Sequence, residues 1–398
     1  MRKLFLIICF CLNFSVAAHE AHQEAHQEAN SSLPVSVTFD SQGKLWRVQV
    51  KADFVEVSYS SDYKSFSIPV RVNAESQNLR PMGEVRPKIA IGSKGEIYVA
   101  WMQNLKSRFA GYIWFARSLD GGKSFETPYI VHQDRAEIGH AYEALHVSPD
   151  GAITILWLDS RDLVNAKAAG KTHSGSSIYY AVSNNQGASF QREQKLADSS
   201  CECCRIATAH KPDGTVAALW RHVFDGNERD HMLAEVPKAG EKPYLHRATY
   251  GRWKIEGCPH HGAALASGGE GADWWGYHIA YFDGNDKKAG LYYIRMDGVA
   301  WASSVPKKFG NHKNQAGHPA LLSLGEKVWL VWRESEDRKD FIFGMFSDDG
   351  GRNWQAAKLL ANTGGKSDYP HLLGKDGQFY LVWNTVKDGL KVVGLPAE

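Results

Sequence analysis

The sequence has almost no helical periodicity, little net charge and few cysteines. Among its 398 residues, 46 lysines and arginines nearly balance 44 aspartates and glutamates, and the formal net charge is +2. A near-neutral chain gives no electrostatic reason to expect nucleic acid or an acidic membrane surface as a partner. Beyond the N-terminal region, no stretch of about 18 apolar residues is free of charges, so we expect no transmembrane segment in the mature chain.

One apolar run lies at the N-terminus and predicts export. Arg2 and Lys3 precede "LFLIICFCLNF", which is followed by small residues at Val16 and Ala18. This order is typical of a secretory signal peptide. We therefore expect cleavage of residues 1–18 and a periplasmic or extracellular protein.

Cleavage changes what the mature chain contains. It removes Cys9, Cys11 and two positive charges, which leaves four cysteines and no formal net charge. The new N-terminus, residues 19–33, is rich in histidine and glutamate. Short His-rich tracts can bind metals, and the alternative is a solvated, flexible tail.

Seven copies of one pattern follow: an apolar strand, a turn containing glycine, and a second apolar strand ending in an aromatic residue. The copies begin at Val35, Pro87, Glu143, Arg205, Ala263, Pro319 and Pro370. Each predicts a β-hairpin, and a spacing of about 50 to 60 residues is that of a four-stranded propeller blade. We expect an all-β fold over residues 34–398, a single β-propeller of four-stranded antiparallel blades. Seven repeats are counted; six blades are the alternative if the first and last hairpins share one.

A second pattern, Ser-x-Asp-x-Gly-x-x-aromatic, follows several hairpins. It occurs as "SLDGGKSF" from Ser118 and "SDDGGRNW" from Ser347, and as "SNNQGASF" from Ser183 with Asn in the Asp place. The Asp or Asn side chain is expected to cap N–H groups of a tight turn between the third and fourth strands, where glycine takes a positive φ. These residues are therefore assigned a structural role.

Together the repeats and turns resemble the sialidase (neuraminidase) superfamily and its Asp-box (BNR) repeats. The resemblance implies a carboxylate clamp of three arginines, a Tyr–Glu nucleophile pair and an Asp acid. The string "VRPKI" is similar to the family's Arg-x-Pro blade start in shortened form and points to Arg86. Blade position alone supplies the other candidates, which are Arg205, Arg333, Tyr369 or Tyr142, Glu143, and Asp159 or Asp162.

The geometry of a propeller predicts where the functional residues meet. The start of each first strand and the end of each second strand emerge on the same face. Many of the chain's polar residues occupy those two positions, including the arginines, histidines and cysteines discussed here. We therefore expect one channel mouth to be the working face.

The four mature cysteines occupy the same face in consecutive repeats. Cys201, Cys203 and Cys204 precede one repeat, and Cys258 precedes the next. Thiolates and imidazoles are ligands for copper and zinc, so we expect a metal site. Its candidate histidines are His260, His261 and His222.

Disulfides are the alternative for these cysteines. Four cysteines in an exported chain are simply accounted for by two bridges. A bridge within the 201–204 loop would be cramped, and strained bridges are readily reduced, which favours redox chemistry over a structural role.

The sequence favours an exported, sialidase-like propeller that binds copper or zinc at its mouth, with redox activity as an option. The alternatives are an exo-α-sialidase-type glycoside hydrolase and a non-catalytic platform for a glycan or another protein. No nucleotide or organic cofactor is indicated.

Overall fold

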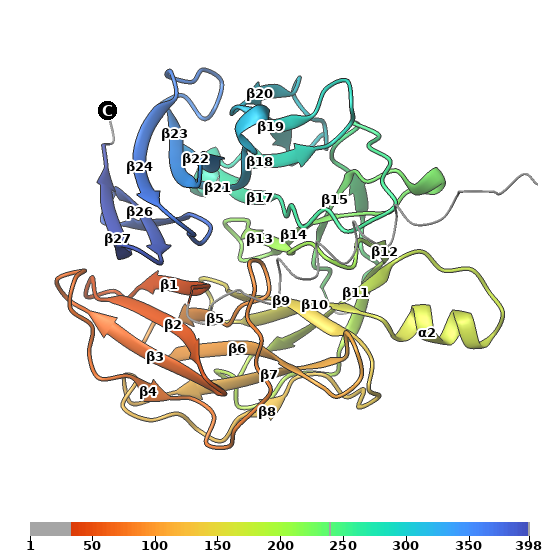
Figure 1. Cartoon of the computed structure of the whole chain (residues 1–398). Helices are drawn as coiled ribbons and strands as arrows, with labels where there is room; N and C mark the ends of the chain where they lie inside the picture. The colour runs from red at the N-terminus through yellow and green to blue at the C-terminus, as the bar shows by residue number, and fades with distance from the viewer. Residues whose placement is uncertain (1–32, 239, 397–398) are drawn as a thin grey trace, which may run out of the picture.

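The computed structural model describes residues 33–238 and 240–396, which form a seven-bladed β-propeller (Figure 1). Blade 1 contains β1 (Val35–Phe39), β2 (Leu45–Lys51), β3 (Phe54–Ser60) and β4 (Val70–Arg71). Blade 2 contains β5 (Lys88–Ile91), β6 (Ile97–Asn104), β7 (Gly111–Ser118) and β8 (Tyr129–Ile130). Blade 3 contains β9 (His140–Val147), β10 (Ile153–Asp159), β11 (Ser176–Ser183) and β12 (Gln194–Ser200).

The second half of the chain repeats this plan. Blade 4 contains β13 (Ala207–His210), β14 (Val216–Arg221), β15 (His231–Glu235) and β16 (Leu245–Arg247). Blade 5 contains β17 (Ala264–Gly268), β18 (Gly276–Asp283), β19 (Gly290–Asp297) and β20 (Lys307–Phe309). Blade 6 contains β21 (Gly317–Leu324), β22 (Lys327–Glu336), β23 (Lys339–Ser347) and β24 (Lys358–Gly364). Blade 7 has three described strands, β25 (His371–Lys375), β26 (Gln378–Thr385) and β27 (Gly389–Leu395).

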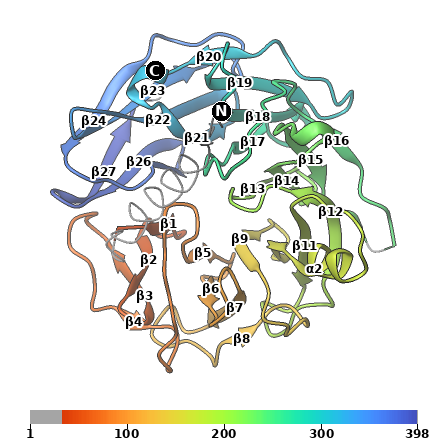
Figure 2. The same ribbon diagram turned by 45° about the vertical axis from the view of Figure 1, so that its right-hand side comes forward.

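The blades are arranged as a closed ring (Figure 2). Within each sheet, neighbouring strands in the chain pair with one another, and every pairing is antiparallel. The innermost strands contact one another in chain order from β1 to β25, and β25 contacts β1. The first and last hairpins belong to separate sheets, so seven blades are confirmed and the six-blade alternative is wrong.

A buried ion pair joins the two ends of the ring. Asp368 lies just before β25 and accepts two hydrogen bonds of 2.6 Å from the guanidinium of Arg86, which lies just before β5. Asp368 Oδ2 also accepts from the backbone N–H of Val35 at 3.1 Å, and Arg86 donates to the Val35 carbonyl at 2.9 Å. Blades 7, 1 and 2 are thereby tied together without sharing a strand.

The aromatic residues that end the second strands form the core between blades. Five of them are tryptophans that are at most 1 % exposed: Trp101, Trp157, Trp220, Trp332 and Trp383. Every residue of β10 is buried, because the strand is covered by a neighbouring blade on each side. Burial of such large side chains supplies most of the stabilisation of each interface.

The Ser-x-Asp turns have the predicted geometry. Ser118 donates to Asp120 Oδ1 at 2.8 Å, and the same oxygen accepts from the backbone of Ser124 at 3.0 Å. Gly122 has a φ of +81°, and a Cβ at this position would lie 2.7 Å from the Trp46 ring. The turn therefore needs glycine for both its backbone and its packing. Asp349 makes the equivalent bond to Ser347 at 2.8 Å.

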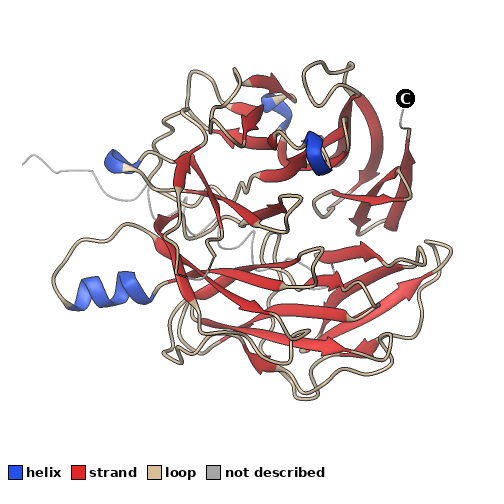
Figure 3. Ribbon diagram, turned by 180° about the vertical axis from the view of Figure 1, so that it is seen from behind, coloured by secondary structure: helices blue, strands red, loops and turns tan. Residues whose placement is uncertain are grey.

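One helix was not expected. Helix α2 (Arg161–Ala168) follows β10, and none of its residues is buried. Because it contributes no apolar face to the core, it has no periodic pattern to detect. Elsewhere in the described part of the chain, the helical segments are single turns: η1 (Asp225–Asn227), η2 (Gly271–Asp273) and η3 (His312–Asn314). Figure 3 shows how small the helical share is. Among the described residues, no helix has the length and hydrophobicity to cross a membrane.

Candidate functional site

The structure brings several of the predicted residues to one channel mouth. The guanidinium carbons of Arg86 and Arg333 lie 5.4 and 5.2 Å from the centre of the Tyr369 ring. His318 stacks on the same ring at 3.5 Å with an interplanar angle of 9°. These residues come from blades 2, 6 and 7, which confirms that strand starts and strand ends of distant blades converge.

Glu84 lies at the centre of this group, although the sequence pattern did not indicate it as a site residue. Its carboxylate accepts hydrogen bonds of 2.9 Å from the backbone N–H groups of Arg205 and Gly262. The guanidinium of Arg205 and the imidazole of His318 each approach Glu84 Oε1 to 3.7 Å. The loop between β4 and β5 thus places an internal carboxylate against blades 4, 5 and 6. We call Glu84, Arg86, Arg205, His318, Arg333 and Tyr369 the mouth cluster.

Burial sets the protonation of the groups in the mouth cluster. It lowers the pKa of His318 to about 4, with a further contribution from the Arg333 charge. Burial opposes ionisation of Glu84, but the nearby imidazole of His318 and the charge and backbone N–H of Arg205 outweigh it and hold its pKa well below the usual range. The mouth cluster therefore contains a neutral imidazole, that of His318, beside the Glu84 carboxylate, which is already paired with Arg205.

The arginines of the mouth cluster are engaged by groups of the protein itself. Arg86 is paired with Asp368, and Arg205 donates to the carbonyls of Ala263 and Pro319 at 3.0 and 2.8 Å. Arg333 donates to the Ser367 carbonyl at 3.2 Å. A substrate carboxylate would have to compete with these partners, and with Glu84 above all.

Glu143, which is buried, and Lys88, which is partly buried, interact electrostatically beside the mouth cluster. Both carboxylate oxygens of Glu143 are buried, and neither accepts a hydrogen bond from a described residue. Burial raises the pKa of Glu143 to about 7, against an opposing effect of Lys88. Burial lowers the pKa of Lys88 to about 8, and its ammonium donates to the Arg86 carbonyl at 2.7 Å.

The cysteines predicted to meet do meet. Sγ of Cys201 lies 3.6 Å from Sγ of Cys203 and 4.0 Å from Sγ of Cys204. One ligand atom from each of these three residues lies within 4.8 Å of the others, and the same holds for Cys203, Cys258 and His260. We call these five residues the thiol cluster, in which Cys203 belongs to both groups.

No disulfide bond joins the four cysteines of the described residues. All four cysteines between residues 33 and 396 are free, and a separation of 3.6 Å is far beyond a disulfide bond. Cys201, Cys203 and Cys204 are buried, whereas Cys258 is exposed. Disulfide bonding therefore finds no support in the described part of the chain.

Hydrogen bonds, and after them positive charge, favour the thiolate form of Cys201. Arg229 donates to Cys201 Sγ at 3.3 Å. Hydrogen bonds with Cys203 and Cys204, followed by the charges of Arg221 and Arg229, lower the pKa of Cys201 well below its usual range. The shared bond with Cys201 has the opposite effect on Cys203 and raises its pKa.

Two of the predicted histidine ligands belong to neither of the two three-residue groups of the thiol cluster, which we call the metal-sized groups. His261 stacks on Phe282 at 4.2 Å and faces His318 at 5.0 Å. His222 packs against Phe224 at 4.5 Å, and burial lowers its pKa to about 4. The geometry therefore favours His260 over both as the imidazole of the thiol cluster.

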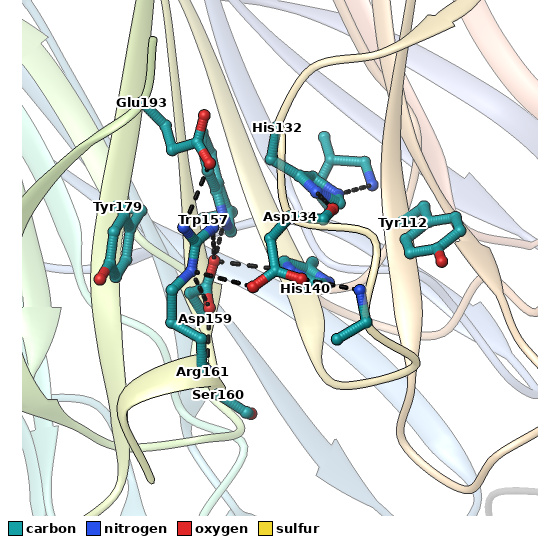
Figure 4. A network of polar contacts seen from close by, with 12 residues as sticks. Tyr112, His132, Asp134, His140, Trp157, Asp159, Ser160, Arg161, Tyr179 and Glu193 are labelled. Atoms are coloured by element: carbon teal, nitrogen blue, oxygen red, sulfur yellow. Dashed lines mark hydrogen bonds and ion pairs between the residues drawn. The ribbon is translucent and has the colours of Figure 1, made fainter. Parts of the chain in front are cut away.

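Asp159, the predicted acid, belongs to a different network (Figure 4). It is fully buried and accepts hydrogen bonds from Trp157 at 2.9 Å and from Arg161 at 2.7 and 2.9 Å. His140 Nε2 lies 3.6 Å from its Oδ2, and His132 stacks on His140 at 3.9 Å.

The other candidates of this region lie apart from the mouth cluster as well. Asp162, the alternative acid, accepts from the Tyr179 hydroxyl at 3.0 Å. Tyr142, the alternative tyrosine, is buried and packs with the thiol cluster. Neither acid candidate is in contact with Tyr369 or the arginines of the mouth cluster.

Comparisons with known proteins identify the fold. No family model and no curated protein matches the chain. An ulvan lyase, described as a new family of polysaccharide lyase and bound to -[GlcA(1-4)Rha3S]-, is 13 % identical, with a TM-score of 0.56 over 93 % of this chain and 92 % of that one. A second structure of an ulvan lyase is 14 % identical, with a TM-score of 0.55 and coverages of 90 % and 91 %.

A sialidase is among the similar structures as well. The Hadza microbial sialidase Hz136 is 14 % identical, with a TM-score of 0.49 over 87 % of this chain and 74 % of that one. At such identities the likeness shows a shared architecture and leaves the activity open. The fold and the site together define this chain as a seven-bladed propeller with a polar, thiol-containing channel mouth.

Proposed function

We propose that this protein is an exported metal-binding propeller that holds copper or zinc in the thiol cluster. The observation that carries the proposal is the convergence of three buried thiols from one loop with Cys258 and His260 from the next blade. The proposed export rests on the signal sequence in residues 1–18, which lies outside the described residues, as does the His-rich tail.

The chemistry of the donors supports a soft or borderline metal. Thiolates select Cu(I) and Zn(II) over the hard cations, which prefer oxygen ligands. Cys203, Cys258 and His260 form a Cys₂His set, which is one of the sets known for zinc with an open fourth position. Cys201, Cys203 and Cys204 offer sulfur alone, which suits Cu(I).

The proposed export to an oxidising compartment is a second reason to expect a bound metal. In an oxidising compartment, thiols that lie this close together are expected to form disulfides unless something protects them. A bound metal keeps thiolates both deprotonated and reduced. Three ligand atoms within 4.8 Å of one another, as in each group of the thiol cluster, are consistent with that protection.

Metal content and thiol content, measured together, test the proposal. The full mature chain is purified from the periplasm, and bound copper and zinc are counted by elemental analysis while thiols are counted after unfolding. We expect close to one ion per chain and four titratable thiols once the metal is chelated. Absence of metal together with two disulfides would refute the proposal.

A carbohydrate-active propeller is the second candidate. It is supported by the resemblance of the Ser-x-Asp turns to sialidase repeats and by the fold shared with an ulvan lyase. The mouth cluster supplies arginines and Tyr369, and nearby Glu143 has a raised pKa of the kind that suits a general acid. The substrate class would be a saccharide with a carboxylate, which must displace Glu84 from Arg205.

Product release distinguishes the two reactions of this candidate. Release of free sialic acid from sialyllactose would indicate hydrolysis, and unsaturated uronate from ulvan would indicate elimination. Either activity should be lost in Tyr369→Phe and retained in Tyr59→Phe, a control in β3 of blade 1. Absence of both products from the metal-loaded wild type would remove this candidate and leave the metal proposal standing.

The raised pKa of Glu143 gives the second candidate a prediction that needs no substrate. Between pH 4.5 and about 7 the unfolded chain loses this proton while the folded chain keeps it, so stability falls as the pH rises. Relative to Glu143→Gln, the wild type should lose on the order of 3 kcal/mol across this window, from about 1.4 kcal/mol per pKa unit.

Chemical denaturation of both proteins at several pH values measures the difference. Glu326→Gln, which removes a charge from an exposed pair with Arg352, is the control and should show little change. A difference between wild type and Glu143→Gln that does not vary with pH would show that Glu143 has an ordinary pKa.

A further inference from the structure

A cavity of about 610 Å³ lies between blades 4 and 5, away from the channel. Its walls come from β16 and the segment that follows it, from β18, β19 and their connection, and from the connection between β19 and β20. None of the lining residues belongs to an innermost strand. Figure 2 shows β16 at the outer rim of the ring.

Aromatic side chains form much of the wall. Tyr250 is 60 % exposed. Trp301 lies against His246 at 5.6 Å and against Tyr244, just outside the cavity, at 5.0 Å. Tyr292 stacks on Tyr281 at 5.7 Å, which fixes its ring in the wall. Aromatic faces that are accessible in a concave site provide flat apolar surfaces with polar edges.

One carboxylate in the cavity is nearly buried, and only one of its two oxygens accepts a hydrogen bond from the described part of the chain. Asp283 is 7 % exposed, and its Oδ1 accepts from the backbone N–H of Asn285 at 2.8 Å. Its Oδ2 accepts no hydrogen bond from any residue in the described ranges. Gly251 makes room for this oxygen, because a Cβ there would collide with it. Burial raises the pKa of Asp283 above its usual value.

Further polar groups border the same space. Lys288 is exposed at the edge of the cavity and attracts the Asp283 carboxylate electrostatically. Ser303 closes one wall by donating to the Ala248 carbonyl at 3.1 Å, and so links blade 5 to blade 4. The volume and the mixture of aromatic walls with few polar groups are typical of small-molecule sites.

We propose that this cavity binds a saccharide residue. The apolar face of a pyranose ring would stack on Trp301 or Tyr250, and Asp283 Oδ2 would accept hydrogen bonds from ring hydroxyls. A neutral, hydroxyl-rich ligand satisfies the carboxylate, whereas an apolar partner would leave it buried without a hydrogen-bond partner. The inference rests on the cavity alone and holds whether or not the mouth binds metal.

Calorimetric titration of the metal-loaded full chain tests this site. The probes are the neutral oligosaccharides cellohexaose, mannohexaose and chitohexaose. We expect at least one to bind, and Trp301→Ala and Asp283→Asn each to weaken that binding by at least tenfold. Tyr250→Ala, at an exposed position, provides a variant whose folding is not at risk. Val299→Ala, an exposed residue outside the cavity, is the control and should bind as the wild type does.

Two results would overturn the proposal. One is that no probe binds at millimolar concentration, or that binding is unchanged in the aromatic and Asp283 variants. The other is that the wild type sediments as a dimer and Trp301→Ala as a monomer, which would make these rings a self-association surface. Metal content is measured in the same samples, so failure here is distinct from failure of the metal site.

Discussion

Cys203→Ser should abolish metal binding while leaving the propeller folded. Cys203 belongs to both metal-sized groups of the thiol cluster, so no group keeps three ligands without it. Loss of an outer-shell partner of a metal ligand costs 10- to 100-fold in affinity, and loss of the ligand itself should cost more than about 100-fold. Competition with a chromogenic chelator measures the affinity, and circular dichroism checks the fold.

Two adjacent histidines provide a matched pair for the same measurement. His260→Gln should weaken metal binding, because His260 lies with Cys203 and Cys258. His261→Gln should leave the metal affinity unchanged, because His261 packs between Phe282 and His318. Equal loss in both variants would mean that the ion lies deeper in the mouth than the thiol cluster.

Asp368→Ala should cost about 3 to 5 kcal/mol of folding free energy, since it leaves the Arg86 guanidinium buried without its carboxylate. The effect is large because Asp368 and Arg86 also hold the backbone of Val35, where the ring closes. Urea denaturation measures the loss.

The same blade offers a control for that measurement. Asp376→Ala removes a carboxylate that is 81 % exposed and paired with Lys375, and it should change stability by less than about 0.5 kcal/mol. A double change, Arg86→Met with Asp368→Leu, should recover part of the loss, because an apolar pair replaces the unpaired charge. Equal stabilities of Asp368→Ala and the wild type would show that the ring closes by other contacts.

Much of the fold could be predicted because it depends on local pattern. Alternating apolar residues around a glycine turn define each hairpin, and the Ser118–Asp120 turn is built from residues within a few positions of one another. Blade geometry then predicts that strand starts and strand ends share a face, which is how Arg86, Arg333 and Tyr369 could be placed together.

The parts that could not be predicted depend on contacts between segments far apart in the chain. Glu84 lies on a connecting loop without a strand pattern, and its partners Arg205 and Gly262 are 121 and 178 residues away. The pairing of Arg86 with Asp368 spans 282 residues. Neither loop conformation nor register across the ring is encoded in a local motif, so these partners become visible only in three dimensions.

Asp159 illustrates the limit of placement by blade position. It does lie at the end of a second strand, as the sequence indicates. Arg161 follows two residues later and turns back onto its carboxylate at the start of α2, which directs Asp159 into a buried network instead of the mouth cluster. The prediction that Cys203 and Cys258 lie close together agrees with the structure, because the loops before the first strands of adjacent blades must run side by side.

X-ray absorption at the zinc edge of the zinc-loaded mature protein tests the central claim most directly, because it reports the atoms bound to the ion. Binding in the thiol cluster predicts at least two sulfur scatterers at about 2.3 Å, with a nitrogen at about 2.0 to 2.1 Å. Sulfur scattering should disappear in Cys203→Ser. A spectrum with nitrogen and oxygen alone in the wild type would place the metal elsewhere, for example on the His-rich tail, and would contradict the account.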